Sequence, residues 1–137
     1  LDVTVEAQIL RIIKRLKMEH NMAVMLITHN FGLVAEVADI VGVMYAGEMV
    51  ETGNVYEIFD NPRHPYTRQL MKALPRITKK EGRLETIRGA VPKMINPDKG
   101  CRFANRCNYA TERCWSENPP VHKLSDTHSY SCFCEEV

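Results

Sequence analysis

The sequence predicts an α/β domain followed by a small, loop-rich extension that contains cysteine. Patterns typical of helices and of strands alternate through residues 1–75, as they do in α/β domains. All five cysteines lie within residues 76–137. A content of 45% hydrophobic and 26% charged residues is typical of a globular protein. We therefore expect one α/β portion over residues 1–75 and a cysteine-rich extension over residues 76–137.

The first predicted element is an amphipathic helix. Its apolar positions recur every three or four residues, and Asp2 or Thr4 is available as N-cap. The predicted buried face consists of Val5, Ile9, Ile12, Ile13 and Leu16. Leu1 leads directly into this pattern without a preceding Met, so we expect the sequence to be a fragment of a longer protein.

The continuous apolar run over residues 22–28 predicts a short strand buried on both faces, as in parallel sheets covered by helices. A shorter helix is predicted over residues 31–38. Residues 40–45 and 49–52 then predict a β-hairpin that turns at Gly47.

Two short helices are predicted after the hairpin. Asn54 can cap a helix that runs to Phe59, and Pro62 ends that pattern. Pro65 is suited to the first turn of a second helix, which Pro75 stops.

His29 is the first candidate functional residue, because ligands of open parallel sheets bind beyond the carboxyl ends of the strands. An imidazole at that place could donate a hydrogen bond to a phosphate or polarise an attacking water. It could equally be an ordinary loop residue.

Residues 1–53 resemble, in order, the C-terminal part of the ATPase domain of ABC transporters, a branch of the P-loop NTPases. The resemblance rests on Leu-Asp-Val-Thr at the start, Thr-His-Asn at residues 28–30 and Met-Tyr-Ala-Gly-Glu-Met-Val-Glu-Thr-Gly at residues 44–53. It implies that Asp2 is the acidic residue of the D-loop at the ATPase dimer interface. It also implies that His29 is the switch histidine that contacts the terminal phosphate. Asn30 stands where this family commonly has Asp.

The motifs that bind ATP and magnesium are missing from these 137 residues. The sequence contains no G-x-x-x-x-G-K-[ST] loop (Walker A), no Leu-Ser-Gly-Gly-Gln type signature and no hydrophobic strand that ends in Asp-Glu (Walker B). In the resembled family these motifs precede the aligned region. The resemblance thus implies that the intact subunit is an ATPase that uses ATP and Mg²⁺, and that the fragment alone is inactive.

The second half resembles the C-terminal extension of oligopeptide and dipeptide importer ATPases. The resemblance rests on His-Pro-Tyr at residues 64–66, Arg-Gly-Ala-Val-Pro at residues 88–92 and the segment from Gly100 through Cys107, Cys114 and Cys132. It implies part of the energy-coupling subunit of a peptide importer. Nickel and some sugar importers share the extension, so their ATPase subunits are alternatives.

Clustered cysteines without an export signal favour a metal site over disulfides. The intervals between them lack close C-x-x-C pairs, and four thiolates suit either one tetrahedral zinc or one iron–sulfur cluster. The resemblance implies a [4Fe-4S] cluster, with zinc as the alternative. It implies the ligands Cys101, Cys107, Cys114 and Cys132, with Cys134 as a substitute for Cys132.

Other residues of the second half receive simpler interpretations. If Cys132 and Cys134 lie in a strand, they point to opposite faces and only one reaches the site. We expect the isolated histidines His64, His122 and His128 to be solvated. We expect Phe103 and Trp115 to form a small core that shields the cysteines.

The net charge of +1 gives no electrostatic basis for binding nucleic acid. The resemblance implies a second ATPase subunit and the transporter's membrane subunits as partners, and a peripheral location on the cytoplasmic face of the membrane. A non-enzymatic module that binds metal, senses redox state or is purely structural is the competing function. Loss of a neighbouring strand beside residues 22–28 predicts self-association or domain swapping of the fragment.

Overall fold

The computed structural model describes residues 3–74, 89 and 99–134. The chain divides into two compact units, Leu1–Asp39 and Ile40–Val137. The predicted boundary between residues 75 and 76 falls outside the described residues and stays a prediction. None of the described helices is long and apolar enough to cross a membrane.

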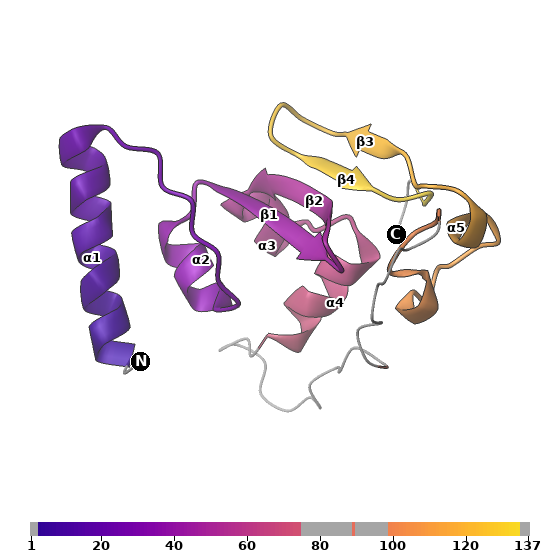
Figure 1. Cartoon of the computed structure of the whole chain (residues 1–137), viewed down its shortest axis with the longest axis horizontal. Coiled ribbons are helices and arrows are strands. Elements are labelled where there is room, and N and C mark those ends of the chain that lie inside the picture. The colour runs from indigo at the N-terminus through magenta and orange to yellow at the C-terminus, as the bar shows by residue number, and fades with distance from the viewer. Residues whose placement is uncertain (1–2, 75–88, 90–98, 135–137) are drawn as a thin grey trace. The chain divides into compact units, whose positions relative to one another are not determined.

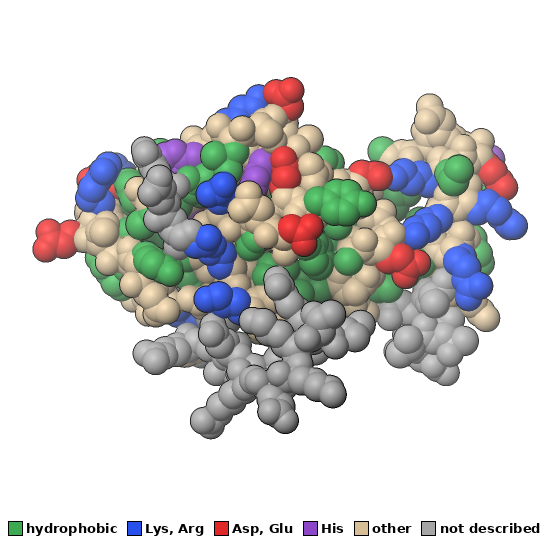
Figure 2. Space-filling model, turned by 180° about the vertical axis from the view of Figure 1, so that it is seen from behind, with side chains coloured by type: hydrophobic (Ala, Val, Ile, Leu, Met, Phe, Trp, Pro, Cys, Tyr) green, Lys and Arg blue, Asp and Glu red, His purple; other side chains and the backbone are tan. Residues whose placement is uncertain are grey.

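The first unit contains two helices, α1 (Val3–His20) and α2 (Phe31–Val37). Asn21 has a φ of 49° and ends α1, while the Met22 amide donates to the Lys17 carbonyl at 3.1 Å. Ion pairs join Lys14 to Glu36, at 3.4 Å, and Lys17 to Asp39. In Figure 2 basic and acidic side chains of this unit surround exposed apolar ones.

The predicted buried strand over residues 22–28 is wrong for the described part of the chain. No strand is present there, and the side chains of Met25 and Ile27 are each 85% exposed. An extended segment becomes a strand only by pairing its backbone amides and carbonyls with a neighbour, and none of the described residues supplies that neighbour. The predicted buried face of α1 also stays largely open, with only Leu10 buried among the described side chains of the helix.

The second unit is built on an antiparallel sheet with strand order β1-β2-β4-β3 (Figure 1). Short helices accompany the sheet, and the last two strands come from the cysteine-rich part of the chain. The fold class is thus confirmed as mixed helix and sheet, whereas the expected parallel pairing is replaced by antiparallel pairing in the described residues. The elements are β1 (Ile40–Tyr45), β2 (Glu48–Asn54), α3 (Val55–Asp60), α4 (Pro65–Ala73), η1 (Ala104–Arg106), α5 (Arg113–Ser116), β3 (Val121–Lys123) and β4 (Ser129–Ser131).

The β1–β2 hairpin is confirmed, and its turn explains the position of Gly47. Ala46 and Gly47 have φ values of 47° and 85°, and type I′ turns require positive φ at both central residues. Glycine adopts this conformation without a steric cost. The turn thus brings β2 back along β1 over its whole length.

Local capping signals set the helices that follow. Asn54 and Glu57 form a capping box: the Asn54 side chain accepts from the Glu57 amide at 3.0 Å, and the Glu57 carboxylate accepts from the Asn54 amide at 2.7 Å. Pro65 occupies the first turn of α4, and His64 is its N-cap. Both predicted helices are therefore confirmed.

A cluster of aromatic rings joins the β1–β2 hairpin, α4 and the cysteine-rich segment. The Phe103 ring lies 5.1 Å from Tyr45 and 5.3 Å from Tyr66, measured between ring centroids. Phe103 is buried, as expected, but Trp115 is 55% exposed, so the expectation that Trp115 shields a core is wrong. The contribution of Phe103 makes the extension part of the same core as the hairpin.

Candidate functional site

His29 lies in the short connection between residues 22–28 and α2. Hydrogen bonds hold the backbone on both sides of it: the Thr28 hydroxyl accepts from the Asn30 amide at 3.0 Å, and the Asn30 side chain accepts from the Gly32 amide at 3.1 Å. The His29 side chain itself is exposed. A fixed backbone with an exposed imidazole suits a residue that reaches outward to an acceptor such as a phosphate oxygen.

Asn30, which stands where the resembled family commonly has Asp, has a structural role that either residue can fill. It is the N-cap of α2, and its Oδ1 also lies 3.4 Å from the Leu33 amide. Asn and Asp are about equally effective as N-caps. Asp2, the other predicted ATPase residue, lies outside the described residues.

The five cysteines belong to the second unit, and none forms a disulfide. The Cys101 amide donates to the Cys114 carbonyl at 2.8 Å, so these two cysteines are held together by their backbones. Gly100 permits this approach: a Cβ at that position would meet the carbonyl oxygens of Cys114 and Trp115 at 3.0 Å. Its φ of 127° is also one that side-chain-bearing residues rarely adopt.

The four predicted ligand cysteines share one feature: each sulfur accepts a hydrogen bond from a backbone amide. The Sγ atoms of Cys107, Cys114 and Cys132 each accept at 3.4 Å, from the amides of Tyr109, Thr111 and Cys134 respectively. The sulfur of Cys101 accepts from backbone amides of the turn that follows it.

Cys134 differs from the other four. Its thiol donates to the Tyr109 carbonyl at 3.7 Å, and it is less buried than Cys132, which is 8% exposed. The expected strand is also not present at these two positions, because β4 ends at Ser131. The two thiols are therefore distinguished by burial and hydrogen bonding rather than by strand alternation.

Burial and mutual proximity disfavour ionisation of the thiols. Burial raises the pKa of Cys101, and the nearby Cys114 thiol raises it further. Burial likewise raises the pKa of Cys107, with added effects of Cys101, Cys114 and Cys134. For Cys132, burial and its neighbours raise the pKa to about 12. The thiols thus lie close enough to influence one another, and thiolates there would need a compensating positive charge.

Within the described ranges, no group of three or more His, Cys, Asp or Glu side chains is arranged to hold a metal ion. The side chains gather, but their donor atoms do not converge on a single point. The chemistry of the donor set, two buried and two half-buried thiols that accept amide hydrogen bonds, nevertheless fits a thiolate-bound metal or iron–sulfur cluster.

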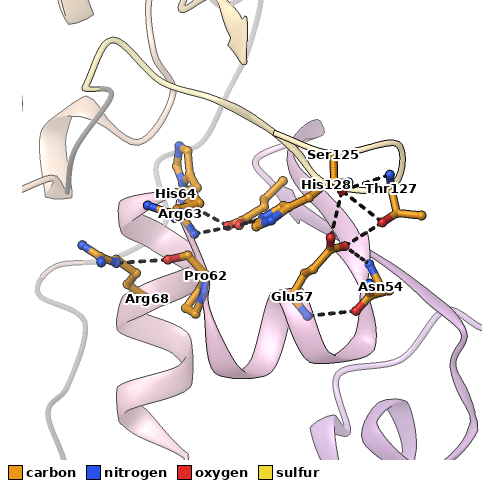
Figure 3. A network of polar contacts seen from close by, with 10 residues as sticks. Asn54, Glu57, Pro62, Arg63, His64, Arg68, Ser125, Thr127 and His128 are labelled. Carbon is orange, nitrogen blue, oxygen red and sulfur yellow. Dashed lines mark hydrogen bonds and ion pairs between the residues drawn. The ribbon is translucent and has the colours of Figure 1, made fainter. Parts of the chain in front are cut away.

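A second polar centre lies around Glu51, His64 and His128, whose side chains are 1%, 1% and 3% exposed. The Glu51 carboxylate accepts from the Arg63 amide at 2.7 Å, from the His64 amide at 2.9 Å and from His128 Nε2 at 2.8 Å (Figure 3). The expectation of solvated histidines is wrong for His64 and His128, while His122 is half-buried. No periodicity in the sequence marks the two buried rings, because elements distant in sequence cover them.

A cavity of about 220 Å³ lies beside this centre. It is bordered by the beginning of β2, the Cys101 turn and the end of β4. A pair of opposite charges, Arg102 Nε and Glu48 Oε1 at 2.8 Å, lies on its wall. The cavity is lined by Glu48, Met49, Val50, His64, Cys101, Arg102, Phe103, Asn118, Pro119 and Ser131.

Sequence comparison finds known proteins that this chain resembles. Residues 50–114 match the family model described as "Oligopeptide/dipeptide transporter, C-terminal region". The chain is 46% identical to the dipeptide transport ATP-binding protein DppD of Escherichia coli, over 96% of this chain and 40% of DppD. It is 48% identical to the oligopeptide transport ATP-binding protein OppD of Bacillus subtilis, over 93% of this chain and 36% of OppD.

A further relative is AppD of B. subtilis, an oligopeptide transport ATP-binding protein that is 41% identical over 99% of this chain and 42% of AppD. The chain thus spans about two fifths of the length of these curated relatives. The predicted resemblance is confirmed: over nearly all of its length the chain is similar to the C-terminal part of oligopeptide and dipeptide transport ATP-binding proteins.

Proposed function

We propose that this chain forms part of the ATP-hydrolysing, energy-coupling subunit of an ABC importer for oligopeptides or dipeptides. The observation that carries the proposal is its 46–48% identity, over more than nine tenths of the chain, to relatives named for dipeptide and oligopeptide transport. The 137 residues lack the phosphate loop and the metal-binding acidic pair, so ATP and Mg²⁺ bind chiefly through other residues of the intact subunit. This chain alone is then inactive.

Within that subunit His29 contacts the terminal phosphate of ATP. An imidazole N–H donates to an oxygen on which negative charge develops during phosphoryl transfer, and such positioning is most of the protein's task in this reaction. The hydrogen bonds at Thr28 and Asn30 support this role, because they fix the backbone while leaving the ring exposed. Asp2 acts at the interface with a second ATPase subunit.

The paired ATPases dock on the membrane subunits of the importer at the cytoplasmic face of the membrane. We infer that the transported solute is a peptide, because the relatives are named for dipeptide and oligopeptide transport. ATPase subunits of nickel or sugar importers are the alternative identity, since they share the extension.

A chimera tests the proposal directly. The matching two fifths of E. coli DppD are replaced by this chain, and dipeptide uptake is measured in a strain without DppD. Restored uptake supports the proposal, whereas a chimera present at normal abundance that gives no uptake overturns it. In the chimera, His29→Ala is expected to lower ATPase activity about 100-fold. The matched variant His20→Ala, at the exposed end of α1, is expected to leave activity unchanged.

The extension is proposed to hold a [4Fe-4S] cluster through Cys101, Cys107, Cys114 and Cys132, with zinc as the alternative metal. Support comes from the four sulfurs, two buried and two half-buried, that accept amide hydrogen bonds, a feature that stabilises thiolate ligands. Cys134 serves as the substitute for Cys132. When bound, the group would supply the positive charge that these thiolates require.

Metal analysis of protein purified without oxygen tests the cysteine site. About four irons and four sulfides per chain with visible absorption support the cluster. One zinc per chain without colour supports the structural alternative. Absence of both metals overturns a metal role for the cysteines.

A redox-sensing module is the second candidate function, favoured by the close packing of the cysteine segment on the β1–β2 hairpin through Phe103. Oxidation of the cluster would then change subunit pairing or uptake in the chimera. Unchanged pairing and uptake after oxidation exclude sensing and leave a structural role.

A further inference from the structure

The ladder between β2 and β4 is too short to fix the C-terminal strands by itself. It consists of two residue pairs, Glu51 with Tyr130 and Thr52 with Ser129. A two-stranded hairpin such as β3–β4 is at best marginally stable alone. The position of this hairpin on the sheet therefore depends on side-chain contacts.

Two glutamates of the β2–α3 segment supply those contacts (Figure 3). Glu51 accepts from His128 Nε2 at 2.8 Å in a fully buried setting. At the turn of the hairpin, Glu57 accepts from the hydroxyls of Ser125 and Thr127, each at 2.8 Å. A buried carboxylate is tolerated only when it is fully hydrogen-bonded, so loss of His128 would leave Glu51 short of a partner.

The hairpin carries Cys132 directly. Cys132 follows β4 and lies four residues after His128. Its amide donates to the Pro120 carbonyl at 3.2 Å, and its carbonyl lies 2.9 Å from His122 Nε2. The backbone of Cys132 is thus held on both sides by residues at or next to β3, and its place in the unit follows that of the hairpin.

We propose that Glu51 and His128 are positioning residues for the cysteine site, holding the β3–β4 hairpin so that the Cys132 thiol stays beside Cys101 and Cys107. The proposal rests on the proposed function of the cysteines as a ligand set. It assigns the buried Glu51–His128 contact a role in keeping together ligands from distant parts of the sequence. Cys101 and Cys132 are separated by thirty other residues, so a short hairpin without this contact would not keep their sulfurs together.

The first test measures the alkylation rate of each thiol in the metal-free full chain. The protein is alkylated under native conditions, and the modified cysteines are identified by mass spectrometry. His128→Leu is expected to raise the alkylation rate of Cys132 by about tenfold or more, since a lost buried hydrogen bond promotes local opening. Cys114 is equally buried but is not part of the hairpin, and its rate should change little. His128→Gln retains an N–H donor and should restore protection.

Three outcomes overturn the proposal: an unchanged Cys132 rate in His128→Leu, an equal rise at all five cysteines, or no rescue by His128→Gln. Lys123→Ala, at an exposed ion pair on β3, is the matched control and should behave as wild type. Glu51→Gln, which keeps the shape of the side chain, gives a second variant should His128→Leu fail to fold.

A second measurement separates this proposal from the cysteine site itself. In protein purified without oxygen, His128→Leu should release metal to a chelator about tenfold faster than wild type, with His128→Gln close to wild type. If wild type carries no metal, the proposed cysteine site fails, while the alkylation result still decides whether Glu51 and His128 position Cys132.

Discussion

Burial of His64 makes the stability of the second unit dependent on pH. Burial lowers the pKa of His64 from its ordinary 6.5 to about 4. Between these values the unfolded chain binds a proton at this residue and the folded chain does not. The unfolded state therefore binds more protons, and the free energy of unfolding falls as the pH drops from 6.5 to 4. At 1.36 kcal/mol per pKa unit, the loss attributable to His64 is about 3 kcal/mol.

The substitution His64→Asn isolates this effect. His64 Nδ1 accepts from the Tyr66 amide at 3.1 Å as the N-cap of α4. Asn supplies an acceptor oxygen at an N-cap but does not titrate. The variant should therefore fold with α4 capped, and it should lose about 3 kcal/mol less than wild type between pH 7 and pH 4.

Urea unfolding followed by the fluorescence of Trp115 is the appropriate assay, because this is the one Trp of the sequence and it lies in the second unit. Subtracting the pH dependence of the variant from that of wild type removes the contributions of other titrating groups. His20→Asn, an exposed histidine of the first unit, is the matched control and should keep the wild-type pH dependence. If wild type and His64→Asn lose the same stability to within about 0.5 kcal/mol, burial of this ring does not control the pH dependence.

Further expectations concern the core, the hairpin turn and the first unit. Phe103→Ala should cost about 3–5 kcal/mol in the same unfolding assay, against about 0.5 kcal/mol or less for the 75%-exposed Tyr56→Ala; equal effects would contradict the proposed core. Gly47→Ala should cost about 1–2 kcal/mol because its φ is 85°, and an unchanged stability would show that the turn adapts. The exposed apolar side chains of Met25 and Ile27 should cause self-association at high concentration, which light scattering would detect and Ile27→Lys should reduce; a strict monomer for the unsubstituted chain would disprove this.

Local signals predicted much of the secondary structure correctly. The cap at Asn54, the helix start at Pro65 and the turn at Gly47 depend on the conformation of a few neighbouring residues, so each could be inferred without knowing the rest of the fold. The strand predicted over residues 22–28 failed because its apolar run indicates only that the segment can be buried. Whether it becomes a strand depends on a pairing partner.

For the candidate site, too, the sequence indicated some features and the structure added others. Cysteine content and motif resemblance identified His29 and the thiols as candidates, and these assignments remain predictions. The structure added the hydrogen bonds that distinguish the two thiols: the Cys132 sulfur accepts from an amide, whereas the Cys134 thiol donates to a carbonyl. It also revealed Glu51, whose role depends on residues far away in the sequence.

The sequence by itself determined the resemblance to peptide-transport ATP-binding proteins, the helices α3 and α4 and the β1–β2 hairpin, because motifs and caps are properties of adjacent residues. Only the tertiary structure decided which polar groups are buried and what they contact. His64 and His128 are polar residues in turn-rich stretches. Phe103 packs beside the His64 ring, and the pairing of β4 with β2 brings His128 to Glu51, so both histidines lie in the interior. Burial is a property of the assembled chain, since it depends on atoms that sequence order leaves far apart.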